Sequence, residues 1–372
     1  MTRPRRVHLV PLAVLAVAVG LPAAAAPAAA AKQPPPPPPP PPAYTITDLG
    51  SLGGGQTVSA GINASGQVTG YSLASTIITE PCPTKYNPKR TCSFHPEHAF
   101  VYSNGTMTDL GTLNDVFSQG NAINVSGEVA GTASKPGPSI EAALWTGTTA
   151  TDLGALAPLS SGSWSIAKDI NDSGQVVGYW AASGSQINTA AHPWLYSNGT
   201  MTSLPVPSDL TAPSCQAGEI NNSGQIIGSC ETNNAQTNHE VLWQNGTVTI
   251  LGTLGGLQVL DLTGINDLGQ IVGWATSSTG AAHGFLDSNG TVTDLGAFLP
   301  GGLNDNGVII GTELNGGAFI YSGGTVQDLN NLIPANSGYT ITSANGINDN
   351  GQIIVQASDA TTSQAAVLLT PN

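Results

Sequence analysis

The sequence predicts an all-β protein, a seven-bladed β-propeller, on three observations. Two hairpin motifs alternate along the chain from residue 44 onward. The pair recurs at spacings of 38 to 61 residues, close to the roughly 40–50 residues of propeller repeats. The first and last β segments are complementary halves of one such unit. Charged residues make up only 9% of the chain, against roughly 25% in an average domain, which disfavours solvated helices and coiled coils.

The first motif is an apolar residue, Asn, two variable residues and Gly, followed by a short apolar run. Asn and its neighbours favour tight turns, and Gly supplies a positive φ. The motif therefore predicts a hairpin between the first and second strands of each blade. Its seven asparagines are Asn63, Asn124, Asn171, Asn221, Asn266, Asn304 and Asn348.

The second motif places two β runs on either side of Asn-Gly, as in residues 98–111. Asn-Gly between such runs is the strongest short-range signal for a hairpin. It predicts the third and fourth strands, so that each unit holds four short strands. Further copies begin at Glu141, His192, His239, His283 and Gly317.

The two ends of the repeat region predict a closed ring. Residues 44–50 match a fourth strand without its third, and residues 364–370 match a third strand without its fourth. We expect the N-terminal strand 44–50 to pair with the C-terminal strand 364–370 and close blade seven. Sharing one blade locks the circle and hides both sheet edges. The alternative is an open solenoid or a pair of packed sandwiches.

The motifs also carry a resemblance. His98-Ala99-Phe100 with a following Asp-Leu-Gly, alternating with the Ile-Asn-x-x-Gly-Gln turn, resembles the HAF-repeat family of bacterial extracellular proteins. The resemblance covers essentially residues 44–372. Departures are local: residues 141–143 and 317–319 differ from the His-Ala-Phe pattern, and Leu303 replaces Ile. It implies secretion and a repeat architecture, and it implies no activity.

Two segments precede the predicted propeller of residues 44–372. Residues 1–31 have the pattern of a secretory signal peptide, with Arg3, Arg5 and Arg6 before an apolar stretch and an alanine-rich cleavage region. The apolar stretch is too short to span a membrane. Residues 32–43 form a proline-rich linker whose nine consecutive prolines favour a stiff polyproline II helix. We expect a secreted protein, extracellular or in the cell envelope, with no membrane span after signal removal.

Charge restricts the partners. Beyond residue 43 the chain keeps five basic residues, against 23 acidic ones. A surface this acidic repels phosphates and anionic head groups, which argues against nucleic acid and anionic membranes. We expect an extracellular glycan or protein as the partner, and a monomer.

The longest connection, residues 71–97, contains Cys82 and Cys92. We expect these cysteines to form a disulfide in an oxidising compartment. Three of the five basic residues lie in the same segment, and we interpret them as a basic protrusion that contacts a partner. The alternative is a surface loop with solubilising charges. The three residues are Lys85, Lys89 and Arg90.

Cys215 and Cys230 flank the fourth Asn turn. Counting back from the turn places them opposite each other or one position out of register. We expect a second disulfide that joins the first and second strands of that blade. Neither cysteine pair has the C-x-x-C spacing of redox and metal sites.

Loop lengths indicate which face of the disc binds. The turns within the two hairpins are short, whereas the connection from the second to the third strand has 27 residues in the first unit and 5 to 13 in the others. We expect a ligand on this variable-loop face, since loops carry function. Four aromatic residues could reach it and stack on sugar rings; the alternative is packing between blades. They are Trp164, Tyr179, Trp180 and Trp274.

The sequence predicts no catalytic residues, no metal and no cofactor. The histidines that begin third strands (His98, His192, His239 and His283) lie in different blades, too far apart to ligate one Zn²⁺ at about 2.0–2.1 Å. We expect them to hydrogen-bond within or between blades. The Asp-x-Gly turns lack the ligand pattern of calcium loops, and motifs of common hydrolases and nucleotide-binding proteins are absent.

These observations favour a secreted binding or scaffold module that recognises a glycan or protein through the variable-loop face. The alternative is a secreted polysaccharide hydrolase or lyase with acidic residues in the propeller funnel. Acidic residues that break the repeat are the candidates for that chemistry. They are Glu97, Asp115, Glu219 and Asp261.

Overall fold

The computed structural model describes residues 43–81, 90–137, 139–154, 163–182, 191–210, 214–231, 238–251, 253–254, 257–276, 280–313, 316–360 and 364–372. The expected signal peptide and nearly all of the expected linker lie outside these residues. The described part is all-β, apart from one short 3-10 helix, η1 (Leu329–Asn331).

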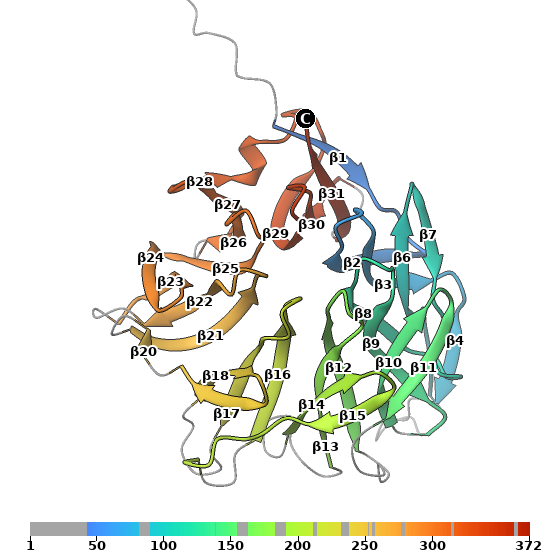
Figure 1. Cartoon of the computed structure of the whole chain (residues 1–372). Coiled ribbons are helices and arrows are strands. Elements are labelled where there is room, and N and C mark those ends of the chain that lie inside the picture. The colour runs from blue at the N-terminus through green and yellow to red at the C-terminus, as the bar shows by residue number, and fades with distance from the viewer. Residues whose placement is uncertain are drawn as a thin grey trace, which may run out of the picture. The chain divides into compact units, whose positions relative to one another are not determined.

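The sheets stand around a central axis in a propeller arrangement (Figure 1). Within the described ranges, five separate sheets of four or five strands each form one blade. The first three comprise β2 (Gly53–Ile62), β3 (Val68–Ala74), β6 (Glu97–Ser103) and β7 (Thr106–Asp109); β16 (Ser214–Ile220), β17 (Ile226–Glu231), β18 (Asn238–Gln244) and β19 (Thr247–Ile250); and β20 (Thr253–Leu254), β21 (Leu257–Ile265), β22 (Ile271–Thr276), β23 (Ala282–Ser288) and β24 (Thr291–Gly296). The other two comprise β25 (Phe298–Leu303), β26 (Ile309–Glu313), β27 (Ala318–Ser322) and β28 (Thr325–Asp328); and β29 (Thr340–Ile347), β30 (Ile353–Ser358), β31 (Ala365–Pro371) and β1 (Tyr44–Asp48).

The expectation of seven separate sheets is wrong, because two antiparallel meanders merge into one eight-stranded sheet. Ile140 in β10 pairs in parallel with Trp164 in β12. Strand β10 is eight residues long, and Ile140 near its start reaches β12, the innermost strand of the next meander. The merged sheet comprises β8 (Ser118–Ile123), β9 (Val129–Lys135), β10 (Ser139–Thr146), β11 (Thr149–Gly154), β12 (Trp164–Ile170), β13 (Val176–Ala181), β14 (Ala191–Ser197) and β15 (Thr200–Ser203).

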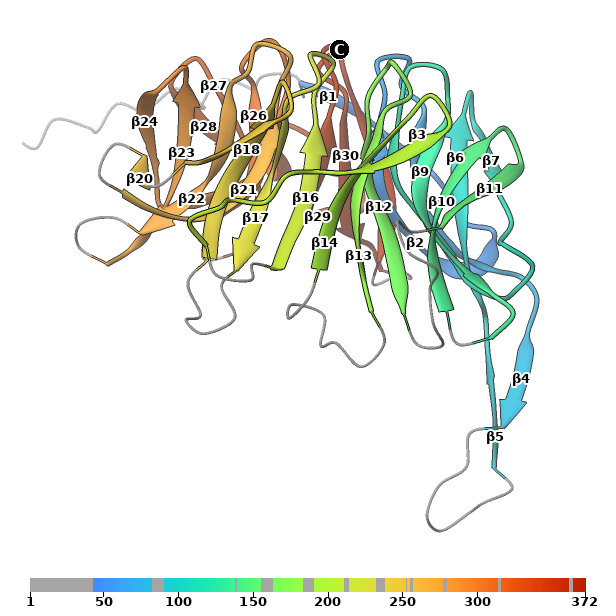
Figure 2. The same cartoon turned by 60° about the horizontal axis from the view of Figure 1, so that its bottom comes forward.

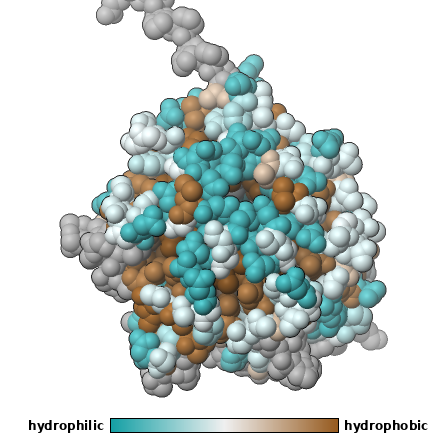
Figure 3. All heavy atoms as spheres, viewed as in Figure 1, coloured by the Kyte–Doolittle hydropathy of each residue, from teal (hydrophilic) through white to brown (hydrophobic). Residues whose placement is uncertain are grey.

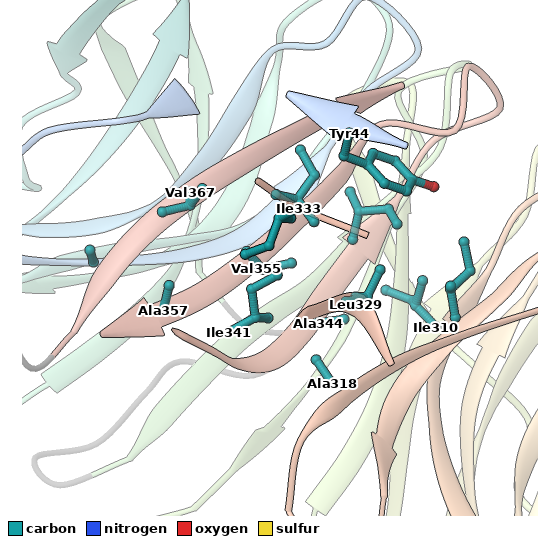
Figure 4. Packing of buried hydrophobic residues seen from close by; sticks show 14 residues of the cluster. Tyr44, Ile310, Ala318, Leu329, Ile333, Ile341, Ala344, Val355, Ala357 and Val367 are labelled. Carbon is teal, nitrogen blue, oxygen red and sulfur yellow. The ribbon is translucent and has the colours of Figure 1, made fainter. Parts of the chain in front are cut away.

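The expected closure by the chain ends is confirmed. Strand β1 pairs antiparallel with β31, from Tyr44 opposite Pro371 to Asp48 opposite Val367. Figure 4 shows the core beneath this pairing, where Tyr44, Ile333 and Val355 lie close together. Tyr44 is only 8% exposed, so the first described strand contributes apolar packing as well as ladder hydrogen bonds.

The turns that join first and second strands are linked in a circle. The side-chain Nδ2 of each motif asparagine donates a hydrogen bond to the backbone oxygen of the next motif asparagine. The series runs from Asn63 through Asn124, Asn171, Asn221, Asn266, Asn304 and Asn348 and back to Asn63, at 2.8–3.3 Å. Each Oδ1 also accepts from the backbone N–H four residues on. All seven are at most 5% exposed, so this asparagine ring satisfies polar groups that water cannot reach.

The two faces of the disc differ as the loop lengths predict. Figure 2 shows the short hairpin turns along one face. A two-stranded ribbon, β4 (Ile78–Pro81) with β5 (Thr91–Phe94), projects from the variable-loop face. The ribbon continues from β3 and β6, where the backbone N–H of Ala74 donates to the oxygen of Pro96.

We expect closure by β1 to be needed for stability. A chain that begins at Ser51 exposes the edge of β31 and loses Tyr44, whose removal from a core costs roughly 3–5 kcal/mol. Its midpoint of chemical denaturation should fall well below that of a chain beginning at Ala43. Equal midpoints and slopes for the two chains would show that the ring does not depend on this strand.

We expect the stability of the protein to fall when one amide nitrogen of the asparagine ring is replaced by oxygen. Asn221→Asp keeps the acceptor oxygen but sets a carboxylate oxygen against the backbone oxygen of Asn266, now 2.9 Å from Nδ2. The free energy of unfolding should drop by roughly 1–3 kcal/mol. The control is Asn198→Asp at an exposed Asn-Gly turn, where the change should stay within about 0.5 kcal/mol. Similar losses of unfolding free energy in both variants would show that the ring asparagines matter no more than an exposed turn asparagine.

Candidate functional site

The central channel is lined by residues that the sheets leave unpaired. Each of the seven innermost strands has a register shift at the same level, which sets one extra residue outside the ladder, as a β-bulge does. These residues surround a cavity of about 360 Å³. They are Ala60, Asn121, Lys168, Gly218, Thr263, Gly301 and Asn345.

Charged groups occupy one side of this channel. Lys168 is the bulge residue of β12, Asp169 follows it, and Glu219 follows the bulge of β16. Asp169 joins the two strands, because its carboxylate accepts hydrogen bonds from the backbone N–H groups of Ile170 and Ile220, both at 2.8 Å. Small residues line most of the rest of the wall, so this part of the channel carries the polar chemistry.

A second cavity of about 370 Å³ shares the wall formed by Lys168 and Glu219. It extends toward the variable-loop face, because Gln216 and Asp261 precede the bulges of their strands. Ser229, Glu240, Asp261, Tyr179 and Gln216 add polar groups to its lining. We call this space the charged cavity.

Burial shifts the pKa values of the acidic groups upward. Burial, with the nearby Asp169, raises the pKa of Glu219 to about 8. Burial and Asp261 raise the pKa of Glu240 to about 8, and burial raises that of Asp169 to about 6 against its two backbone hydrogen bonds. The pKa of Asp261 is also raised by burial, although the Trp274 side chain donates a hydrogen bond to it. Two of the four carboxyl groups are therefore protonated near neutral pH.

Lys168 does not neutralise these acids by direct contact. Its ammonium forms no ion pair within 4.0 Å, and the only such pairs within the described ranges involve Lys135, His98 and His283. A buried acid elsewhere shows the contrast. Glu141 is 2% exposed and has the Nζ of Lys135 3.3 Å away, whereas Glu240 is 3% exposed and has no cation beside it among the described residues.

The structure brings together some of the predicted aromatic residues and separates others. Tyr179 lines the charged cavity, and Trp164 packs against it edge to face with ring centres 5.5 Å apart. Trp274 reaches the cavity through its hydrogen bond to Asp261. Trp180 instead stacks on His192, 4.6 Å away. Neighbours along a strand point to opposite faces, so Tyr179 and Trp180 could not both face one ligand.

The predicted basic protrusion is separate from the channel. Arg90 is exposed beside the ribbon of β4 and β5, and Lys85, Lys89 and Cys82 lie outside the described residues. Cys92 is disulfide-bonded. A role for this segment in partner contact stays a prediction.

The second predicted disulfide is present. Cys215 lies directly opposite Cys230 in the ladder of β16 and β17, and the two sulfur atoms are bonded. Such bonds are typical of oxidising compartments. Within the part of the chain that the structure describes, no helix is long and apolar enough to cross a bilayer.

Two of the four histidines that begin third strands make the expected local hydrogen bonds. Nδ1 of His98 lies 2.8 Å from a carboxylate oxygen of Asp109, and His283 pairs with Asp294 at 3.0 Å. Across the described residues, no group of three or more His, Cys, Asp or Glu side chains could hold a metal ion.

The opposite mouth of the channel has a second acidic feature. Side chains that follow the motif asparagines accept hydrogen bonds from the backbone of the preceding turn; Asp172, Asn222, Asp267, Asp305 and Asp349 take part. Hydrophilic residues gather at the centre of this face in Figure 3. Because these groups bond to one another in a repeated pattern, we interpret them as part of the scaffold.

Sequence reasoning missed Lys168, Asp169 and Glu240 as site residues. Glu240 had a usable signal: it takes the place of the alanine in the His-Ala-Phe pattern, and the equivalent Ala99 is fully buried. Both Leu110 and Leu251 donate a backbone hydrogen bond to this position. An acid at a buried repeat position marks a departure from the scaffold.

Comparison with known proteins supports the fold and leaves the chemistry open. Residues 119–241 match a family described as "Protein of unknown function (DUF3466)", and no curated protein matches the chain. Among solved structures, the chain is similar to the β-propeller domain of the trilobed protease from Pyrococcus furiosus, with a TM-score of 0.50 and 10% identity over 84% of this chain and 93% of that one. That propeller is described as having an open velcro topology, whereas here β1 pairs with β31.

Two peptidases are similar over part of their length. A puromycin-hydrolyzing peptidase of Mycobacterium tuberculosis has a TM-score of 0.52 and 10% identity over 89% of this chain and 55% of that one. An acylaminoacyl peptidase from Pyrococcus horikoshii has a TM-score of 0.49 and 10% identity over 87% and 52%. The chain thus spans about half the length of these peptidases. The similarity to the mycobacterial peptidase, at 10% identity, shows a shared fold alone.

The raised pKa values predict how stability depends on pH. The native carboxyls of Glu219 and Glu240 hold their protons up to about pH 8, whereas an unfolded glutamate releases its proton near pH 4.5. The folded state therefore binds more protons, and stability should fall as pH rises between these values, by at most about 1.4 kcal/mol per pH unit for each group.

Urea denaturation between pH 5 and 8.5 tests this. Glu240→Gln should flatten the decline, because it removes one of the two groups. The exposed Glu313 provides the matched control, and Glu313→Gln should keep the wild-type slope. A wild-type stability that rises over this range would contradict the burial of uncompensated carboxyl groups.

Proposed function

We propose that the protein is a secreted binding module that takes a glycan into the charged cavity at the variable-loop end of the channel. In this proposal the eight-stranded sheet acts as two blades, β8–β11 and β12–β15, because a single parallel pair joins them. The ring then has seven blades, in agreement with the seven members of the asparagine ring. Export through a signal peptide at residues 1–31 is part of the proposal, supported by the Cys215–Cys230 disulfide.

The observation that carries the proposal is the charged cavity itself. Its volume of about 370 Å³ lies within the roughly 300–1,000 Å³ of small-molecule sites, enough for a sugar residue or two. Carboxyl, amide and hydroxyl groups from Glu219, Gln216 and Ser229 line it. Sugar hydroxyls both donate and accept hydrogen bonds, and this mixed lining supplies partners for both.

The aromatic pair favours a glycan over a protein surface. Tyr179, which is 8% exposed, lines the cavity, and Trp164 packs edge to face against its ring. An aromatic ring packs well against the apolar face of a sugar. A protein partner would need a contact area of roughly 800 Å² on each side, more than a recess of about 370 Å³ offers.

Blocking the cavity tests the proposal. A Cβ built on Gly218 meets only ordinary contacts, the nearest at 3.4 Å, so Gly218→Leu should fold normally and place its side chain in the charged cavity. Glycans retained by the wild-type protein on an array should bind Gly218→Leu at least tenfold more weakly by calorimetry. A Cβ built on Gly302 meets only Ile310, at 4.0 Å, and Gly302 lines the channel but not the charged cavity, so Gly302→Leu should bind like wild type. Unchanged binding in Gly218→Leu would place the ligand elsewhere.

A second candidate is a secreted polysaccharide hydrolase or lyase. The specific observation for it is the pair Asp169 and Glu219, with pKa values of about 6 and about 8. Near neutral pH one carboxyl is mostly ionised and the other protonated, which is the division of roles in acid–base cleavage of glycosidic bonds. Release of new reducing ends from a bound glycan, abolished by Glu219→Gln, would favour this candidate. Retention without turnover favours the binding module.

A further inference from the structure

Acidic groups outnumber basic groups in the lining of the channel and the charged cavity. Four carboxyl groups face the channel and the cavity from four strands: Asp169 on β12, Glu219 on β16, Glu240 on β18 and Asp261 on β21. One basic residue, Lys168 on β12, shares this lining. Tyr179 on β13 is the remaining titratable group.

The carboxyl groups differ in how far the protein satisfies them. Asp169 accepts two backbone hydrogen bonds, and Asp261 accepts from Trp274 and the backbone of Leu262. One oxygen of Glu240 accepts from Asn238 Nδ2 at 2.5 Å. The carboxyl group of Glu219 receives no hydrogen bond from any described residue, although it lies on the wall common to both cavities.

Buried charges in proteins are normally paired with an opposite charge. Glu141 is paired with Lys135, whereas Glu240, almost equally buried, has no cation beside it among the described residues and holds its proton near neutral pH. Lys168 lines the same cavity but forms no ion pair with any of these acids. Glu219, Glu240 and Asp261 line one cavity of about 370 Å³, and none of them forms an ion pair within the described ranges.

We propose that the charged cavity recognises a sugar residue carrying a free, protonated amino group, with Glu219, Glu240 and Asp261 around the ammonium. This inference rests on the proposed glycan binding and adds the chemical class of the ligand. An ammonium has three donors, which matches three carboxyl acceptors on different strands. The hydroxyl groups of the same residue would meet Ser229, Gln216 and the face of Tyr179.

The carboxyl groups of the charged cavity differ from those on the exposed acidic surface. Exposed carboxylates attract cations weakly, and salt screens them. In the cavity Glu240 is only 3% exposed, so a bound ammonium should favour its ionised form and donate strong charge-assisted hydrogen bonds to it. A neutral acetamido group at the same place would leave the carboxyl groups unpaired.

Matched oligosaccharides provide the test. The probes are β-1,4-linked glucosamine hexamer, its fully N-acetylated form and cellohexaose, titrated calorimetrically into the whole protein at pH 6.5 in 150 mM salt. The glucosamine hexamer should bind at least tenfold more tightly than the other two. Glu219→Gln should remove most of that preference. Glu313→Gln, on an exposed strand end, should keep it.

Other results would overturn the inference in separable ways. Equal binding of all three probes, lost in Gly218→Leu, would leave glycan binding standing and refute the amino-group preference. Equal weakening by Glu219→Gln and Glu313→Gln would show general attraction to an acidic surface. No binding of any probe, together with an empty glycan array, would refute the proposed function as well. Glu219→Gln removes a buried carboxyl group, so it should fold; its unfolding midpoint verifies this.

Discussion

The closed circle of asparagine side chains is the constraint on which the rest of the structure depends. Each Nδ2 needs the backbone oxygen of the next turn, and the last of these bonds joins Asn348 to Asn63 across 285 residues of sequence. Because all seven groups are buried, leaving any one unpaired costs free energy. Every innermost strand is therefore held at one height and distance from the axis, and the bulges of these strands lie at one common level.

The site follows from that common level. The ladder fixes the residues on either side of each bulge, whereas the bulge residue faces the channel and has no role in the ladder. In most units this position and the next are small, and in β12 and β16 they include Lys168, Asp169 and Glu219. The acidic groups destabilise the folded protein as they ionise, since burial raises their pKa values. The repeated hydrogen bonds of the seven units tolerate this loss of stability at one side of the channel.

Local chemistry explains what the sequence could predict. Turn residues are recognisable one by one, so the hairpins and the pairing of residues 44–50 with the C-terminal strand could be predicted. Joining of two meanders depends on Ile140 meeting Trp164, a contact between units that no local pattern encodes. Glu219 and Asp261 could be noted as departures from the repeat, but their convergence with Lys168 depends on three bulges. Tyr179 and Trp180 are adjacent, and because successive side chains of a strand point to opposite faces, only Tyr179 lines the cavity.

The bulge residues have a further consequence for how such a chain can diverge. A side chain that takes part in neither the ladder nor the inter-blade core can be exchanged without repacking the fold. Seven bulge positions, from Ala60 to Asn345, encircle a single passage. Asn121 and Asn345 donate hydrogen bonds to the backbone of the neighbouring unit, and the other five positions make no such bond among the described residues. We expect descendants of the same ancestor to keep the turns nearly invariant while these five residues vary, so that one architecture binds many different ligands.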